Sequence, residues 1–177
     1  MNRPEGLPAA VPAAVPASHA DALPRFRLPV RVYYQDTDAG GVVFHAAYLH
    51  FLERARTEFL RSLGFDIGRL AAEGVLFALN RLEMEFLRPA RLDDALEVTA
   101  AVGHLGRTSA RFVQTVELAD GTVAMRATLS LVCVCATRFR PMGIPQDLRS
   151  ALESWTLPAV GTAGPGPRPD NGTGSTG

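Results

Sequence analysis

The sequence contains no lysine, two cysteines and no long run of apolar residues. All 18 basic residues are arginines, and they balance 18 acidic residues, so no basic excess is available for broad nucleic-acid binding. Two cysteines are too few for a disulfide framework. No apolar stretch approaches the roughly 18 residues of a membrane span, and prolines interrupt the apolar N-terminus where a signal peptide would be continuous. We therefore expect a cytoplasmic protein that neither binds nucleic acid nor inserts into a membrane.

The 177 residues are enough for one domain. Proline recurs at every fourth position from Pro4 to Pro16, and residues 158–177 hold six of the sixteen glycines and four of the thirteen prolines. Both compositions are typical of disordered segments. We predict disordered tails over residues 1–24 and 158–177, and a folded domain over residues 25–157.

Hydrophobic periodicity predicts the elements of this domain. Alternation from Val30 to Tyr34 indicates a half-buried strand. A helix is expected over residues 46–63, ended by Gly64, because its apolar residues share one stripe at 100° per residue: Tyr48, Phe51, Leu52, Ala55, Phe59 and Leu63.

The remaining sequence is mostly strand. A short helical turn is expected over residues 66–72, strands over 81–86, 95–103, 108–118 and 122–136, and a last helix after Pro145. Asp120-Gly121 is a hairpin turn signal. This order predicts an α+β fold in which one long amphipathic helix packs on an antiparallel sheet in two layers.

The segment YYQDTDAGGVVFHAAY, residues 33–48, carries the strongest chemical signal. Asp36 and Asp38 lie between a strand and the start of the long helix, followed by Gly40 and Gly41. The first turn of that helix, near His45, offers unpaired backbone N–H groups that can stabilise an oxyanion, and a carboxylate facing them suits acyl transfer. Asp and Gly are also common turn residues, so the spacing by itself favours an ordinary capped loop over a catalytic one.

The stretch from VRVYYQDTDAGG to RTEFLRSLGF closely resembles the 4-hydroxybenzoyl-CoA thioesterase family, and within it the YbgC-like branch associated with the Tol–Pal system. The segments HLGRTSARFVQTV and LSLVCVCATRFRPMGIP extend the resemblance over about residues 29–152. It implies a hotdog fold, in which a curved antiparallel sheet wraps a long central helix, and the hydrolysis of an acyl-CoA thioester.

The resemblance also implies roles for individual residues. Asp38 matches the catalytic carboxylate and Asp36 a residue that orients the loop, while the oxyanion donor is a backbone N–H at or next to His45. Gly41, Val42 and Tyr48 fall where the family positions its substrate. No cofactor or metal is implied, because coenzyme A is part of the substrate.

The partners implied are an acyl-CoA substrate, with an acyl carrier protein as the alternative thiol carrier, and further copies of the chain. Family members join two subunits edge to edge into one continuous sheet with the site at their interface, so we expect a homodimer or a dimer of dimers. Arg81, Arg88 and Arg107 are candidates to meet the phosphates of coenzyme A, and each is also consistent with an ordinary exposed arginine.

Several alternatives remain open from the sequence. The His45 side chain suits either a direct role or a structural one, and Glu58, which can simply pair with Arg54 on the helix surface, is the next carboxylate to consider. A hotdog hydratase, using a histidine with an acidic partner, and a catalytically silent acyl-binding protein are the competing functions. Cys133 and Cys135 are expected to be buried core residues rather than metal ligands.

Overall fold

The computed structural model describes residues 24–158. The predicted tails lie almost entirely outside these residues. The elements are β1 (Phe26–Arg31), the 3-10 turn η1 (Tyr34–Asp36), α1 (Ala47–Ser62), α2 (Ile67–Ala72), β2 (Val75–Phe86), β3 (Ala95–Leu105), β4 (Ser109–Leu118), β5 (Val123–Cys135) and α3 (Gln146–Glu153). Within the described residues, no helix is long and apolar enough to cross a membrane.

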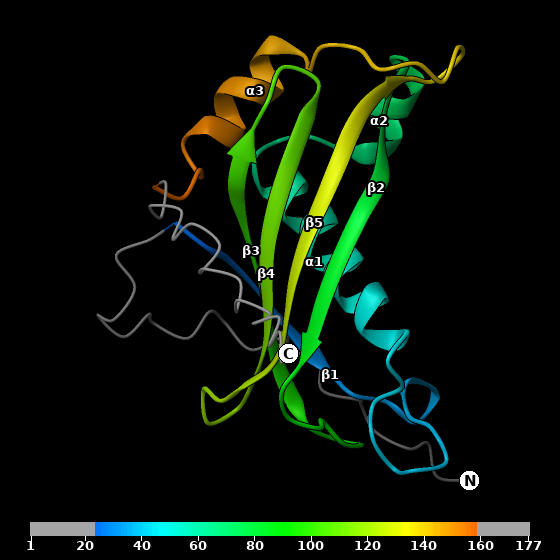
Figure 1. Ribbon diagram of the computed structural model, residues 1–177, viewed down its shortest axis with the longest axis vertical. Coiled ribbons are helices and arrows are strands. Elements are labelled where there is room, and N and C mark those ends of the chain that lie inside the picture. Colours follow the sequence, from blue (N-terminus) through cyan, green and yellow to red (C-terminus); the bar gives the residue numbers. More distant parts are fainter. Residues whose placement is uncertain (1–23, 159–177) are drawn as a thin grey trace, which may run out of the picture.

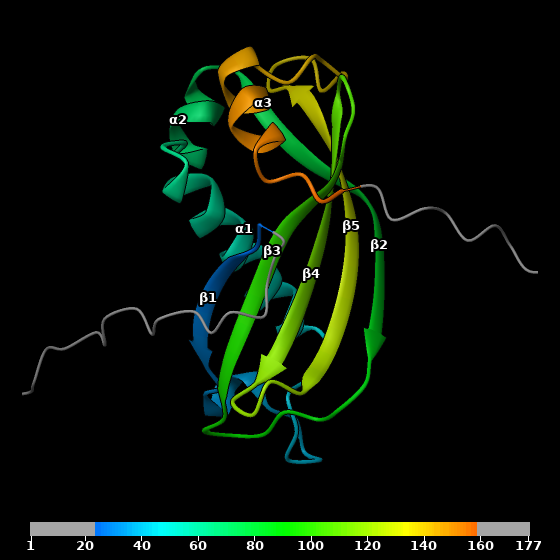
Figure 2. The ribbon, with the colours of Figure 1, turned by 90° about the vertical axis from the view of Figure 1, so that its left-hand side faces the viewer.

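The five strands form one sheet in the order β1-β3-β4-β5-β2, and all neighbouring strands are antiparallel. The sheet is long and curved, and α1 lies along one of its faces (Figures 1 and 2). The two helices α2 and α3 lie at the same end of the molecule, beyond the C-terminal end of α1 (Figures 1 and 2). This arrangement confirms the hotdog fold that the resemblance implied.

The central helix forms where its periodicity predicted it, within one residue at each end. The predicted stripe is buried, with Phe51, Leu52 and Phe59 at most 1% exposed, while Leu63 at its C-terminal end is half-buried. Gly64 ends the helix in the left-handed conformation, with φ at 88°, and donates its N–H to the carbonyl of Arg61 at 2.9 Å. Local sequence signals therefore suffice to explain this element.

The first strand differs from its prediction. It spans Phe26–Arg31, and the alternation beyond it is misleading: Val32 is buried, but Tyr34 is 82% exposed in η1. The chain turns here because the Asp36 side chain accepts a hydrogen bond from the N–H of Tyr33 at 2.8 Å. That turn takes precedence over the apolar alternation.

The second strand is longer than predicted. It begins at Val75, six positions before the expected start, because VLFALN at residues 75–80 is nearly continuous in apolar residues and has no period of two. The run pairs with β5 from Val75 opposite Cys135 onward, with a register irregularity between Leu79 and Arg81. Pairing therefore extends the strand where the local pattern gave no signal.

A charged side chain lies on the buried face of α1. Arg56 is 5% exposed and donates a hydrogen bond from Nη1 to Oε1 of Gln114 in β4 at 2.8 Å, and it also pairs with Glu53. Gln114 is fully buried and donates to the carbonyls of Leu52 at 3.1 Å and Thr99 at 3.3 Å. Burial lowers the pKa of Arg56, and Glu53 opposes that shift. This network ties α1 to the middle of the sheet.

Candidate active site

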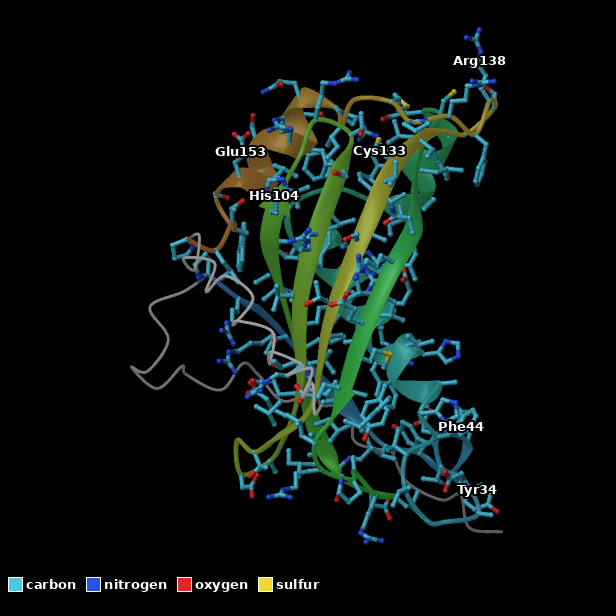
Figure 3. The ribbon with its side chains drawn as sticks, in the orientation of Figure 1. Tyr34, Phe44, His104, Cys133, Arg138 and Glu153 are labelled. Atoms are coloured by element: carbon cyan, nitrogen blue, oxygen red, sulfur yellow. The ribbon has the colours of Figure 1, made fainter. Side chains whose placement is uncertain are left out.

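The loop between β1 and α1 is held on both sides by backbone hydrogen bonds. Val32 donates its N–H to the carbonyl of Asp94 at 3.0 Å, and Val43 donates to the carbonyl of Ala90 at 2.8 Å. The carbonyl of Asp36 accepts the N–H of Phe44 at 2.8 Å, which closes the loop on itself. Tyr34 and Phe44, which flank the loop, lie close together at one end of the molecule, beside the start of α1 (Figure 3). The loop therefore has a defined position beside the helix.

Asp38 opens a tight turn at the tip of this loop. Its carbonyl accepts the N–H of Gly41 at 3.0 Å, and its Oδ1 accepts the N–H of Gly40 at 2.8 Å. Gly41 has φ at 71°, which favours glycine, and a methyl group on Gly40 would lie 3.0 Å from Oδ1 of Asp38. Among residues 24–158 no hydrogen-bond donor contacts Oδ2, and the side chain is exposed. One carboxylate oxygen is thus held while the other faces outward.

The start of α1 supplies backbone donors near this turn. The helix begins after Ala46, which makes no side-chain cap hydrogen bond. Within the described part of the chain, the N–H groups of Val42 and His45 make no hydrogen bond, whereas Gly41 already donates to Asp38. Unpaired N–H groups at a helix start carry partial positive charge. Gly41 is therefore committed to shaping the turn, and the free donors include the N–H groups of Val42 and His45.

The turn and the helix start border an open groove with a volume of about 390 Å³. Asp38, Val42, His45, Tyr48 and Arg88 all line it, and so do residues that the sequence did not single out: Val43, Phe86, Leu87 and Pro89. The loop before α1 forms one wall of the groove, and the segment after β2 forms the other. The hydrogen bond from the N–H of Val43 to the carbonyl of Ala90 holds these two walls together. The groove therefore combines a carboxylate, free backbone donors and an arginine.

Tyr48 and His45 have different surroundings. Tyr48 is 3% exposed, its hydroxyl accepts the N–H of Ala90 at 3.4 Å, and its ring meets Phe86 edge-on at 5.5 Å. Burial raises the pKa of the Tyr48 phenol. His45 is exposed, and its ring contacts Phe44 at 4.2 Å. Tyr48 is thus part of the groove wall, whereas the His45 side chain is accessible to a bound molecule.

Other predicted residues lie elsewhere. Arg81, in the middle of β2, pairs with Glu83, its Nε donating to the carboxylate at 2.9 Å, and exposed Arg107 lies in the turn between β3 and β4. Neither lines this groove. Glu58 lies about 16 Å along α1 from Ala47, at 1.5 Å per residue.

Glu58 also has a different partner from the one expected. It pairs with Arg61 rather than with Arg54, since three residues along a helix bring side chains together as well as four do. Glu58 does not line the groove beside His45. The pairing of His45 with Glu58 that the hydratase alternative would use is therefore absent from this groove in the described chain.

The cysteines also differ from each other. Cys133 is fully buried, as predicted, and burial raises the pKa of its thiol. Cys135 is only half-buried, which corrects the prediction, because β5 ends there and the chain leaves the core. Hydrogen bonds from the Thr137 hydroxyl and from the backbone lower the pKa of the Cys135 thiol to about 7. Residues 24–158 contain no group of His, Cys, Asp and Glu side chains suited to a metal ion.

A second cavity lies at the other end of β2, and no sequence signal pointed to it. It has a volume of about 170 Å³ and lies between α1, α2 and the first half of β2, with residues of β4, β5 and α3 completing its wall. Its walls are almost entirely apolar, and the charged residues on it are Arg56 and Glu53, which already pair with each other. It is lined by Glu53, Arg56, Leu60, Ile67, Leu70, Val75, Leu76, Phe77, Leu79, Ala110, Phe112, Leu131 and Leu152.

Comparison with known proteins gives consistent matches. Residues 40–125 match the model of the thioesterase superfamily. The acyl-CoA thioester hydrolase YbgC of Escherichia coli O6:H1 is 45% identical over 123 residues, which cover 70% of this chain and 92% of that protein. The acyl-CoA thioesterase YbgC of Haemophilus influenzae is 41% identical over 128 residues, covering 72% and 93%.

The solved structures agree on the fold. A DHNA-CoA thioesterase from Staphylococcus aureus superposes with a TM-score of 0.70 at 20% identity, covering 73% of this chain and 89% of that one. At that identity the likeness shows the fold alone. The sequence matches carry the relationship further, because they span nearly the whole length of the curated relatives. The chain therefore belongs to the thioesterase superfamily and, within it, to the group of the YbgC acyl-CoA thioesterases.

Proposed function

We propose that this protein hydrolyses an acyl-CoA thioester, with Asp38 as the reacting carboxylate and the backbone donors at Val42 and His45 as the oxyanion site. The reaction adds water across the C–S bond and yields a carboxylic acid and the free thiol of coenzyme A. The observation that carries this proposal is the position of the Asp38 carboxylate at the rim of a groove that begins at the α1 N-terminus. No protein cofactor is required.

The geometry suggests how the chemistry proceeds. A thioester carbonyl lying in the groove would direct its oxygen to the free N–H groups, which stabilise the negative charge that develops there. Asp38 acts from the other side in one of two ways. It attacks the carbonyl carbon, the C–S bond breaks, coenzyme A leaves as its thiolate, and water then hydrolyses the mixed anhydride; or it removes a proton from the water that attacks the carbonyl. The hydrogen bond from Gly40 holds Oδ1 and leaves Oδ2 for this step. Asp36 acts through the loop, since its carboxylate bonds the backbone of Tyr33.

Arg88 is the arginine best placed to meet the coenzyme A phosphates within the same subunit, because it lines the groove. A guanidinium can bind phosphate oxygens through two parallel hydrogen bonds. Arg81 and Arg107 do not line the Asp38 groove. Coenzyme A and acyl carrier proteins both present such phosphates, and we expect the reaction to take place in the cytoplasm.

The free edge of β2 supports a homodimer. Both β1 and β2 end the sheet, but β1 has 6 residues and contains Pro29, whereas β2 has 12 residues and no proline. An unpaired edge of that length tends to pair with another strand. Leu79 and Phe86, on β2, are 50% and 52% exposed. We infer that two subunits pair through β2, and light scattering that detected monomers alone at micromolar concentration would contradict this inference.

Replacing Asp38 with asparagine tests the proposed chemistry. The change keeps the size of the side chain and the bond from Gly40 but removes the base and nucleophile. We expect kcat for a good acyl-CoA substrate to fall at least about a hundredfold, with little change in KM. Release of free thiol from a panel of acyl-CoAs, followed with a thiol reagent, measures it.

The matched control is Asp36→Asn, in the same loop. It should lower the stability of the protein more than the turnover of its folded fraction, because Asp36 bonds the backbone of the loop. Near-normal turnover by the Asp38→Asn protein would refute the proposed mechanism. Tight binding of acyl-CoA by the wild-type protein without thiol release would instead indicate a silent binding protein.

A further inference from the structure

The chain forms a short hairpin directly after β5. Cys135, the last residue of β5, donates its N–H to the carbonyl of Arg140 at 2.9 Å, and Phe139 donates its N–H to the carbonyl of Cys135 at 2.8 Å. Residues 136–139 form the tip that joins the two arms of this hairpin. The tip lies at one end of the molecule, with Arg138 projecting beyond the strands (Figure 3).

Phe139 is held in this tip in a conformation that its side chain disfavours. Its φ is 52°, in the left-handed region where a bulky residue is an outlier. Glycine is the usual residue where a hairpin loop needs this conformation. Packing offsets little of the cost, since Phe139 is 68% exposed. Backbone strain that the fold does not offset is typical of positions kept for function.

Two arginines flank the exposed ring. Arg138 and Arg140 are both exposed, and neither pairs with a carboxylate within residues 24–158. Gly74, at the end of α2, accepts a hydrogen bond from the base of the tip, but the adjacent Glu73 is already paired with Arg69 at 2.8 Å. The tip therefore presents an aromatic ring between two positive charges that the described chain leaves uncompensated.

This chemistry fits the surface of an anionic membrane. Phenylalanine rings bury themselves at the boundary between headgroups and acyl chains, and each arginine near an anionic leaflet raises the affinity about fivefold. A stable protein interface needs about 800 Å² from each partner, more than a tip of this size offers. We propose that residues 136–140 are a peripheral docking site for an anionic phospholipid surface, with the Phe139 ring entering the headgroup region.

The docking site is separate from the Asp38 groove. Val75, at the start of β2, pairs with Cys135 at the base of the tip, whereas Phe86, at the other end of β2, lines the groove. A membrane bound at the tip thus leaves the groove of the same subunit open to solvent. The inference goes beyond the proposed function and does not depend on it.

Cosedimentation of the full-length protein with lipid vesicles tests the docking site. The protein should bind vesicles that contain phosphatidylglycerol at an ionic strength of about 0.01 M and be released near 1 M, because the Debye length falls from about 30 Å to about 3 Å. It should not bind vesicles of pure phosphatidylcholine. The double variant Arg138→Ala/Arg140→Ala should bind about twentyfold more weakly.

Replacing Phe139 with glycine separates docking from folding. Phe139→Gly should weaken binding about fivefold or more, because the ring no longer leaves water, and should not lower the melting temperature, because glycine suits the positive φ. Leu92→Gly and Arg126→Ala are the matched controls, since both side chains are exposed and lie outside the hairpin. Neither control should change vesicle binding.

Phe139→Trp reports directly on the tip. Its fluorescence should shift to shorter wavelength when anionic vesicles are added, with the wild-type spectrum, which comes from Trp155 alone, as the background. No binding to anionic vesicles, equal binding to neutral ones, or full binding by Phe139→Gly would overturn the inference. A Phe139→Gly protein that melts well below the wild type would also overturn it, because the ring would then serve the fold. Thiol release from acyl-CoA without vesicles should be unchanged in these variants, so it tests the proposed function separately.

Discussion

The buried bond between Arg56 and Gln114 should be one of the most sensitive points of the fold. Replacing Gln114 with leucine keeps a side chain of similar size in a position that is 0% exposed. The change removes the acceptor that Nη1 of Arg56 contacts at 2.8 Å. The guanidinium then stays in the core with Glu53 as its remaining side-chain partner.

The magnitude follows from these contacts. A hydrogen bond to a charged group contributes about 1.5–3 kcal/mol, and leaving a buried donor unpaired adds its desolvation cost. The carbonyls of Leu52 and Thr99, which Gln114 also contacts, belong to α1 and β3 and add little. We therefore expect Gln114→Leu to lower the free energy of unfolding by about 2–4 kcal/mol. This is a large share of the roughly 5–15 kcal/mol typical of a domain.

A double-mutant cycle separates the bond from the packing. Arg56→Met removes the charge and keeps the length of the side chain, so the double variant Arg56→Met/Gln114→Leu has no buried donor left unpaired. It should be more stable than the sum of the single effects predicts, by about 1–3 kcal/mol.

Urea unfolding of the wild type, the two single variants and the double variant, all at the same protein concentration, gives the four free energies of unfolding that the cycle needs. Gln35→Leu is the control, because Gln35 is exposed, and it should change stability by less than about 0.5 kcal/mol. Strictly additive single effects, or a Gln114→Leu protein as stable as the wild type, would refute the coupling between these two residues.

Two further predictions concern the Asp38 turn and the half-buried thiol of Cys135. Gly41→Ala should lower the free energy of unfolding by about 1–2 kcal/mol, because residue 41 has a positive φ. In Gly40→Ala the new methyl group would lie 3.0 Å from Oδ1 of Asp38, so this variant should lower kcat and change the melting temperature little. Cys135 should react with iodoacetamide at a rate that rises through about pH 7, since the thiolate reacts and its pKa is lowered to about 7. Thr137→Val should raise that pKa and slow the reaction at pH 7, as mass spectrometry of the labelled peptide would show; an unchanged rate profile would rule out the Thr137 hydrogen bond as the cause.

The features that depend on residues close together in the sequence could be predicted from the sequence. The helix from Ala47 to Ser62 follows from a 3.6-residue apolar period and a glycine at its end. The resemblance of residues 29–152 to a thioesterase family correctly implied the hotdog fold, because a sequence that shares a long motif shares the fold that positions it. The turn residues around Asp38 were also recognisable, since Asp and Gly form such turns for local reasons.

Other features depend on pairs of residues that are distant in the chain. The start of β2 at Val75 needed β5 beside it, and the burial of Arg56 needed Gln114 from β4. The groove wall at Phe86 reaches the Asp38 loop through the bond between Val43 and Ala90. Such a contact leaves no periodic pattern in the sequence around either residue. The sequence by itself determined the central helix, the family and the carboxylate turn; the tertiary structure decided which residues surround that turn and where the apolar cavity lies, because both arise from packing between segments that meet only after the chain has folded.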